Sequence, residues 1–102
     1  MILALAILLT WTDAINPPGA TYHVYRAPGV CSDFSRFERL TPAPVAVKTH
    51  QDTPAPGNWC YRVTALAGGI ESAPSAPVTV LAQPAAPTGL TATPAPVPAS
   101  PP

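Results

Sequence analysis

Proline constrains what this chain can fold into more than any other residue does. Sixteen of the 102 residues are proline, and they recur from residue 17 to the last residue. Proline lacks the backbone N–H that a helix interior or a central strand uses. No stretch shows a sustained 3.6-residue apolar period either. Long helices are therefore excluded, and the sequence predicts an all-β chain of short strands separated by turns.

The stretches between the proline clusters have the alternation of short strands. Strands are predicted at residues 6–12, 21–26, 45–53, 59–66 and 76–82, with a short edge strand around 37–40. The clearest is "WCYRVTAL", where Trp59, Tyr61 and Val63 share one face and Cys60 and Arg62 the other. The Gly-Gly pair at 68–69 predicts a hairpin turn, because both residues take positive φ without strain.

The first residues, "MILALAILLTWTDA", allow more than one interpretation. Residues 2–9 are all apolar, but eight residues cannot span a bilayer as a helix, so no membrane span is expected. We interpret "AILLTWTD" as a buried strand. The alternatives are a secretory signal, which normally carries a basic segment that is absent here, a membrane anchor, or a misplaced start codon.

Charge excludes one class of partner. The formal net charge is zero and 10% of the residues are charged, with the five basic residues scattered along the chain. Nucleic-acid binding needs clustered basic side chains that neutralise phosphates, so no nucleic-acid partner is expected. A surface this poor in charge favours association with protein over a solitary soluble monomer.

Four pieces of the sequence, taken in order, resemble a fibronectin type III domain of the bacterial and phage type. They are "LLTWTD" for strand B, "GATYHVYRA" for strand C, "PGNWCYRVTAL" for strand F and "GGIESAPSAPVTV" for the F–G hairpin. The resemblance implies an immunoglobulin-like Greek-key β-sandwich over residues 1–82, followed by a Pro/Ala-rich extension over 83–102. It implies a core formed by Leu9, Trp11, Tyr22, Val24, Trp59, Tyr61 and Val63.

The chain departs from that family in two places. Trp59 stands where the family usually has a tyrosine whose hydroxyl anchors the corner before strand F, so that corner must be tied differently. The family's strand A precedes strand B, whereas here a strand A-like segment, "PAAPTGLTAT" (residues 84–93), follows strand G.

Three explanations of the displaced segment remain open. The chain is a piece of a tandem array, or the segment closes its own domain, or it is donated to a neighbouring subunit by β-augmentation. In the last two cases the closing or intersubunit strand consists of Pro87, Thr88, Gly89, Leu90, Thr91 and Ala92.

The two cysteines, Cys31 and Cys60, are expected to form a disulfide. In the fold that the resemblance implies, Cys60 should lie on the outward face of strand F, and Cys31 follows strand C, the neighbour of F in the sheet. Unlinked thiols are the alternative, whereas a zinc site would need more ligands. A disulfide indicates an oxidising setting: extracellular, cell-surface or virion-exterior.

No catalytic motif is visible, so the sequence predicts no enzyme, no metal and no cofactor. Binding is harder to exclude, because His23, Tyr25 and Arg62 should share the outward face of the strands predicted at 21–26 and 59–66. That face is either a candidate binding face or an ordinary solvated sheet face.

These features predict a non-enzymatic structural or interaction module of an extracellular or virion-exterior assembly, such as a phage structural or surface filament protein. Its partners would be copies of itself or other assembly subunits, with carbohydrate as a further candidate. The alternative is a spacer or carbohydrate-associated module of a secreted hydrolase, or a fragment of a tandem array.

Overall fold

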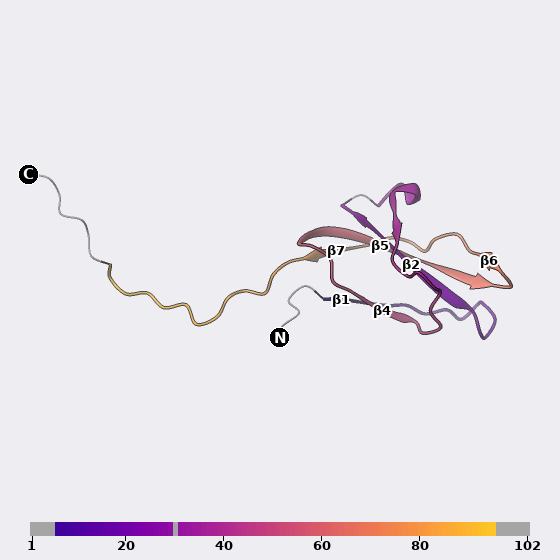
Figure 1. The fold of residues 1–102 in the computed structure, drawn as a ribbon, viewed down its shortest axis with the longest axis horizontal. Helices are drawn as coiled ribbons and strands as arrows, with labels where there is room; N and C mark the ends of the chain where they lie inside the picture. The colour runs from indigo at the N-terminus through magenta and orange to yellow at the C-terminus, as the bar shows by residue number, and fades with distance from the viewer. Residues whose placement is uncertain (1–5, 30, 96–102) are drawn as a thin grey trace, which may run out of the picture.

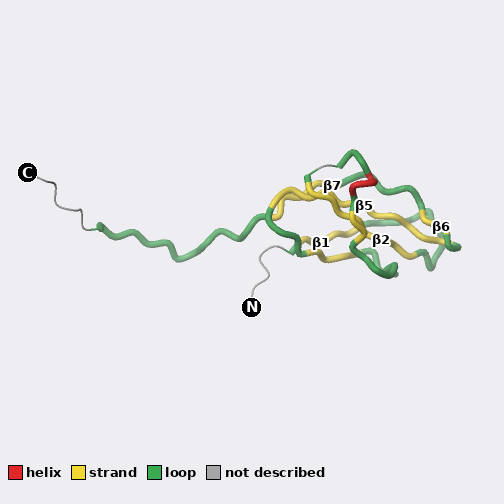
Figure 2. Tube along the Cα trace, turned by 45° about the horizontal axis from the view of Figure 1, so that its top comes forward, coloured by secondary structure: helices red, strands yellow, loops and turns green. Residues whose placement is uncertain are grey.

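The computed structural model describes residues 6–29 and 31–95, and these residues form β-strands, turns and a single three-residue 3₁₀ turn (Figure 2). The prediction of an all-β chain is confirmed. In chain order the elements are β1 (Ile7–Thr10), β2 (Thr21–Pro28), the 3₁₀ turn η1 (Phe34–Arg36), β3 (Glu38–Arg39), β4 (Thr49–Asp52), β5 (Gly57–Ala67), β6 (Ile70–Glu71) and β7 (Val78–Ala82).

The strands form two antiparallel sheets, which lie as two layers (Figure 1). One sheet pairs β1 with β4. In the other, β2 lies between β3 and β5, and both β6 and β7 pair with the remaining edge of β5. The predicted Gly68-Gly69 hairpin turn joins β5 to β6, with φ of 59° and 79° at the two glycines. Positive φ at both positions explains why glycine occupies them.

The side chains between the two sheets form the hydrophobic core. Ile7, Val24, Tyr61 and Ala82 are buried there, and Val24 at the centre has no exposed surface. Partly buried side chains pack around them, namely Leu9, Trp11, Leu40, Trp59, Val63 and Val80. Tyr22 is also buried, and its ring meets Trp11 edge-on at 5.6 Å between centroids. The seven residues expected in the core therefore all lie in or beside it.

Four predicted strands are shorter in the structure. Of the predicted 37–40 only Glu38–Arg39 is a strand, and β7 begins at Val78 rather than at residue 76. Within 45–53 only Thr49–Asp52 is a strand, and Val45 makes an isolated bridge to Tyr22. Within 6–12 the strand is Ile7–Thr10, although the N–H of Trp11 still donates to the Lys48 carbonyl at 3.1 Å. The predictions are longer because apolar and polar residues continue to alternate past the strand ends, where the backbone no longer forms a continuous ladder of hydrogen bonds.

The strand after the Gly-Gly turn is interrupted between β6 and β7. There the N–H groups of Ser72 and Ser75 donate to the carbonyls of Ala65 and Val63, both at 2.8 Å. In return, the serine hydroxyls accept from the N–H groups of the same two residues, at 2.9 and 3.0 Å. Pro74, between the serines, has no N–H to donate. Side-chain hydroxyls therefore replace backbone acceptors along this part of β5.

The corner before β5 is tied by an indole. The Trp59 Nε1–H donates to the Ala55 carbonyl at 2.7 Å, four residues upstream. The Arg26 guanidinium lies over the Trp59 ring, 4.6 Å from its centroid. Tryptophan thus serves as a donor to a nearby upstream carbonyl, the same kind of bond that a tyrosine hydroxyl makes at such corners.

After β7 the chain leaves the two sheets as an extended segment (Figure 1). Residues 83–95 form no strand and all are exposed; Leu90 is 94% exposed. The strand A-like segment 84–93 therefore does not lie against β1 in this structure. Residues 1–5 of the predicted sandwich (1–82) and residues 96–102 of the predicted extension (83–102) lie outside the described residues. No helix among residues 6–29 and 31–95 is long and apolar enough to cross a membrane.

Candidate interaction groove

Both sheets end on the same side of the domain, at β1 and at β7. Among the described residues no strand pairs with the second edge of β1 or of β7. Because the Trp11 N–H points toward β4, the antiparallel pattern turns the N–H and C=O groups of Leu8 and Thr10 away from β4. These four backbone groups face the free edge, where another strand could bind.

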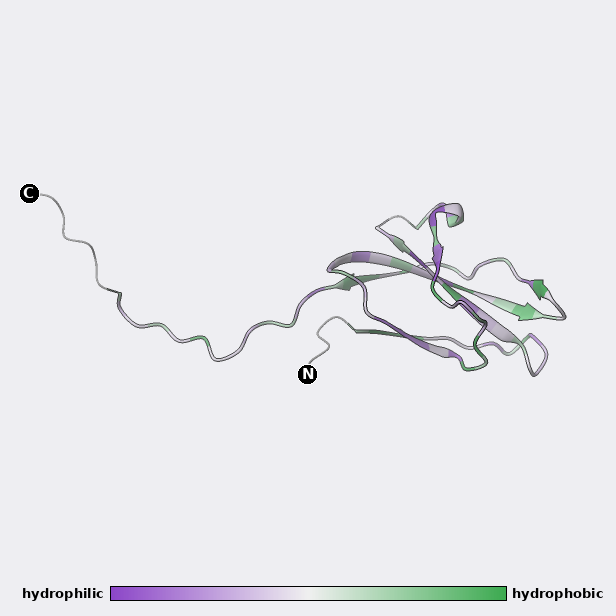
Figure 3. Ribbon diagram, viewed as in Figure 1, coloured by the Kyte–Doolittle hydropathy of each residue, from purple (hydrophilic) through white to green (hydrophobic). Residues whose placement is uncertain are grey.

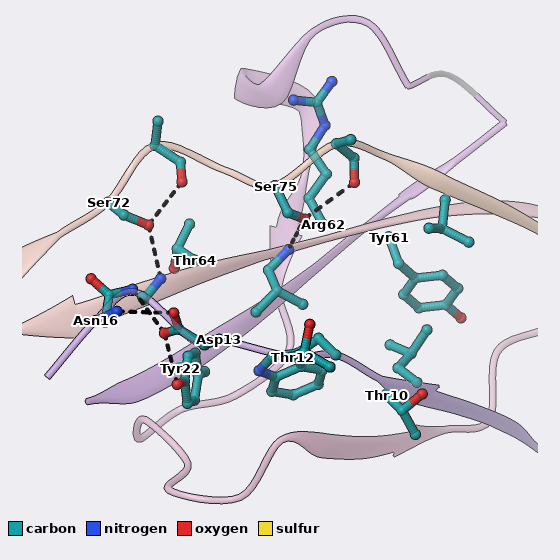
Figure 4. Close-up of a pocket in the computed structure, with 17 residues that line it drawn as sticks. Thr10, Thr12, Asp13, Asn16, Tyr22, Tyr61, Arg62, Thr64, Ser72 and Ser75 are labelled. Atoms are coloured by element: carbon teal, nitrogen blue, oxygen red, sulfur yellow. Dashed lines mark hydrogen bonds between the residues drawn. The ribbon is translucent and has the colours of Figure 1, made fainter. Parts of the chain in front are cut away.

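Two hollows follow one another along these edges. The larger, about 440 Å³, lies between Leu9–Asp13 on one side and Ser72–Val78 on the other, with residues 61–65 of β5 beneath (Figure 4). The smaller, about 310 Å³, lies between Ala6–Leu8 and Val80–Gln83. We call the two hollows together the β1–β7 groove.

The walls of the β1–β7 groove are mainly apolar. The larger hollow is lined by Leu9, Trp11, Val63, Ala65, Ala73, Ala76 and Val78, and its polar groups include the hydroxyls of Thr10, Thr12, Ser72 and Ser75. Leu8, Val78 and Leu81 are more than half exposed along its length, and β7 is coloured as a hydrophobic strand in Figure 3. Apolar walls beside unpaired backbone groups suit an extended peptide better than a charged ligand.

A carboxylate closes one end of the larger hollow (Figure 4). Asp13 accepts hydrogen bonds from the Asn16 side chain at 2.8 Å, the Asn16 N–H at 3.2 Å and the Tyr22 hydroxyl at 2.9 Å. These bonds, led by those from Asn16, lower the pKa of Asp13 from 3.8 to about 2. The turn after β1 is therefore held by an ionised carboxylate at neutral pH.

We expect this carboxylate to make stability depend on pH at the acidic end. The unfolded chain binds a proton near pH 3.8 and the folded chain only near pH 2, so the stabilisation is present above pH 3.8 and is lost as pH falls through about 2. In Asn16→Ala the pKa of Asp13 should rise toward 3.8, and in Tyr22→Phe it should rise less. NMR titration of the Asp13 side chain measures both. An unchanged pKa in Asn16→Ala would contradict this account of the turn.

The candidate binding face on the other side of the second sheet is covered by the chain itself. His23 is 4% exposed and its Nδ1 lies 2.7 Å from the Thr41 hydroxyl, so the expectation that it is a surface residue is wrong. Tyr25 is half-buried, with its ring 4.8 Å from that of Phe34. Arg62 donates to the Cys31 carbonyl at 2.6 Å. These three residues contact the 31–41 segment and Glu71 rather than forming a free surface.

The disulfide between Cys31 and Cys60 is confirmed, with the two Cα atoms 5.6 Å apart. Cys60 lies on the predicted face of β5 but is fully buried rather than outward. The Thr79 hydroxyl lies 3.2 and 3.4 Å from the two sulfur atoms. The disulfide thus fixes the start of the 31–41 segment over the second sheet, which explains why that face is covered.

Sequence reasoning missed a polar cluster between the sheets. Asp52, near the end of the strand predicted at 45–53, ends β4 and accepts from the Tyr61 hydroxyl at 2.7 Å and from Arg26 at 3.0 and 3.2 Å. Arg26 also donates to Glu38 at 3.2 Å. Burial, followed by the bond to Asp52, raises the pKa of Tyr61. In the sequence, Arg26 and Asp52 stand out only as charged residues at or next to the ends of two predicted strands.

Within residues 6–29 and 31–95 no three His, Cys, Asp or Glu side chains gather as metal ligands do. The β1–β7 groove is thus characterised by apolar walls and free backbone groups. Comparison with known proteins adds no assignment: no protein-family model matches the chain, and no curated protein matches it.

Proposed function

We propose that the chain folds as a fibronectin type III-like Greek-key β-sandwich in which the place of strand A is open. The four resembling pieces fall on β1, β2, β5 and the β6–β7 stretch. In immunoglobulin-like sandwiches strand B shares a sheet with A and E, while C shares one with F and G. The pairing of β1 with β4, and of β5 with β2 and β7, agrees with that grouping. Strand A would then lie on the free edge of β1.

On this basis the protein is a non-enzymatic interaction module that binds an extended strand of a protein partner. The observation that carries the proposal is the β1–β7 groove, with apolar walls beside the free N–H and C=O groups of Leu8 and Thr10. The Cys31–Cys60 disulfide supports placing it in an oxidising setting, as part of an extracellular or virion-exterior assembly.

A selection from a displayed library of random heptapeptides tests strand binding. Selected peptides should alternate apolar and polar residues, and they should bind the full chain. Thr10→Pro removes one free N–H and places a ring on the free edge, leaving the bonds to β4 in place, so binding should be lost. Thr10→Val keeps the N–H and should retain binding. If no peptide is selected, or if selected peptides bind Thr10→Pro as well as the parent, the proposed function is wrong.

A further inference from the structure

We propose that the strand occupying the β1–β7 groove is residues 88–93 of a second copy of this chain, antiparallel to β1. The inference rests on the proposed function and names its partner. One molecule carries both halves of the contact, namely a groove with an unpaired edge and an extended, fully exposed segment. The remaining question is whether the segment reaches its own groove or that of a neighbour.

The direction in which the chain leaves β7 favours binding of the segment to the groove of a neighbouring copy. The start of β1 and the end of β7 lie at the same end of the groove, since Ala6–Leu8 and Val80–Gln83 line one hollow. The chain's own extension leaves from that end (Figure 1). An antiparallel partner of β1 must instead enter beside Asp13 and run toward Ile7.

The linker is too short for the chain to enter its own groove in that direction. From Ile7 to Asp13 the groove is about 20 Å long, at roughly 3.3 Å per residue. The residues from Gln83 to Thr88 reach at most about 17 Å when fully extended, and they would still have to turn back. A second copy placed beyond the Asp13 end has no such restriction.

The chemistry of the segment fits the groove. Pro87 and Pro94 bracket six residues, all of which keep an N–H for pairing with Leu8 and Thr10. Alternation places Thr88, Leu90 and Ala92 on one face, so the two apolar side chains of the segment point the same way. Leu90 is 94% exposed in the single chain and would be buried against the apolar wall.

The present conformation of the segment does not oppose docking. Gly89 has a φ of 75°, and glycine also takes extended values without steric cost. The segment 88–93 contains no charged residue, and the residues that line the groove include two, Asp13 and Arg62. The guanidinium of Arg62 donates to the Cys31 carbonyl. Because each copy donates one strand and accepts one, the contact is head-to-tail and generates open-ended chains of copies.

A complementation experiment in the full chain tests the inference. Thr10→Pro blocks the groove but leaves the donor segment intact. Leu90→Asp disables the donor by placing a charge against the apolar wall, weakening the contact about 10- to 100-fold, and leaves the groove intact. Each variant alone should be monomeric by light scattering, and their mixture should form a 1:1 dimer. Unmodified chain should form larger species whose mass rises with concentration.

Thr91→Asp, on the opposite face of the segment, is the matched control and should assemble like the unmodified chain. Thermal unfolding of each variant verifies that it is folded. A monomeric unmodified chain would overturn the inference, while the peptide selection would still decide the proposed function. Variants that assemble like the parent would show that copies associate through another surface, which also overturns it.

Discussion

Replacing both Cys31 and Cys60 by serine should lower the free energy of unfolding by about 3–4 kcal/mol, because the disulfide closes a loop in the unfolded chain. The two residues are 29 positions apart in the sequence. Few side chains are fully buried in this domain, so a loss of that size is a large part of the stability expected for it. Urea unfolding followed by tryptophan fluorescence measures the difference.

Reduction of the unmodified chain should produce the same loss, which separates the effect of the disulfide from that of the serines. Breaking the disulfide should also expose the second sheet, because the 31–41 segment is held by the disulfide at Cys31 and by the hydrogen bond from Arg62 to the Cys31 carbonyl. Hydrogen exchange at β2 and β5 should therefore become faster in the reduced chain. A loss below about 1 kcal/mol would contradict a loop-closure origin, since that model requires several times more.

Asp52→Ala is expected to cost about 2–4 kcal/mol, as it removes the partner of two groups between the sheets. The side chains of Arg26 and Asp52 are 20% and 13% exposed, and the Tyr61 hydroxyl donates to the same carboxylate. Without Asp52, both donors lose a charged acceptor where water has limited access. Chemical unfolding of the variant measures the cost.

Glu38→Ala is the matched control for this cluster. Glu38 pairs with the same Arg26, but its side chain is 70% exposed, so its removal should cost less than about 1 kcal/mol. Tyr61→Phe removes only the hydroxyl and should fall between the two variants. Equal costs for Asp52→Ala and Glu38→Ala would show that burial between the sheets does not strengthen the interaction.

The sequence predicted those parts of the fold that depend on neighbours along the chain. Alternation between prolines located β2 and β5, and two adjacent glycines located the β5–β6 turn. The Cys31–Cys60 disulfide followed from the expected adjacency of two strands. The strands and the turn are local features, so residue pattern was sufficient for them. The adjacency behind the disulfide came instead from the resemblance to fibronectin type III domains.

What the sequence did not predict depends on segments that meet across the fold. Alternation shows which side chains share a face, but not which loop covers that face, so burial of His23 beneath the 31–41 segment was missed. The ion pair of Asp52 joins two sheets and has no local signature. The sequence showed an extended, β-compatible segment after the last strand, yet the apolar walls between β1 and β7 became evident only once the two strands were placed.

The most direct test of the donated strand is hydrogen–deuterium exchange with mass spectrometry on the assembled full chain, with Leu90→Asp as the unassembled reference. Residues 7–12 and 88–93 should slow together on assembly, because each supplies the hydrogen-bond partners of the other. Fast exchange at 88–93 in the assembled chain, matching that of the Leu90→Asp variant, would contradict the account.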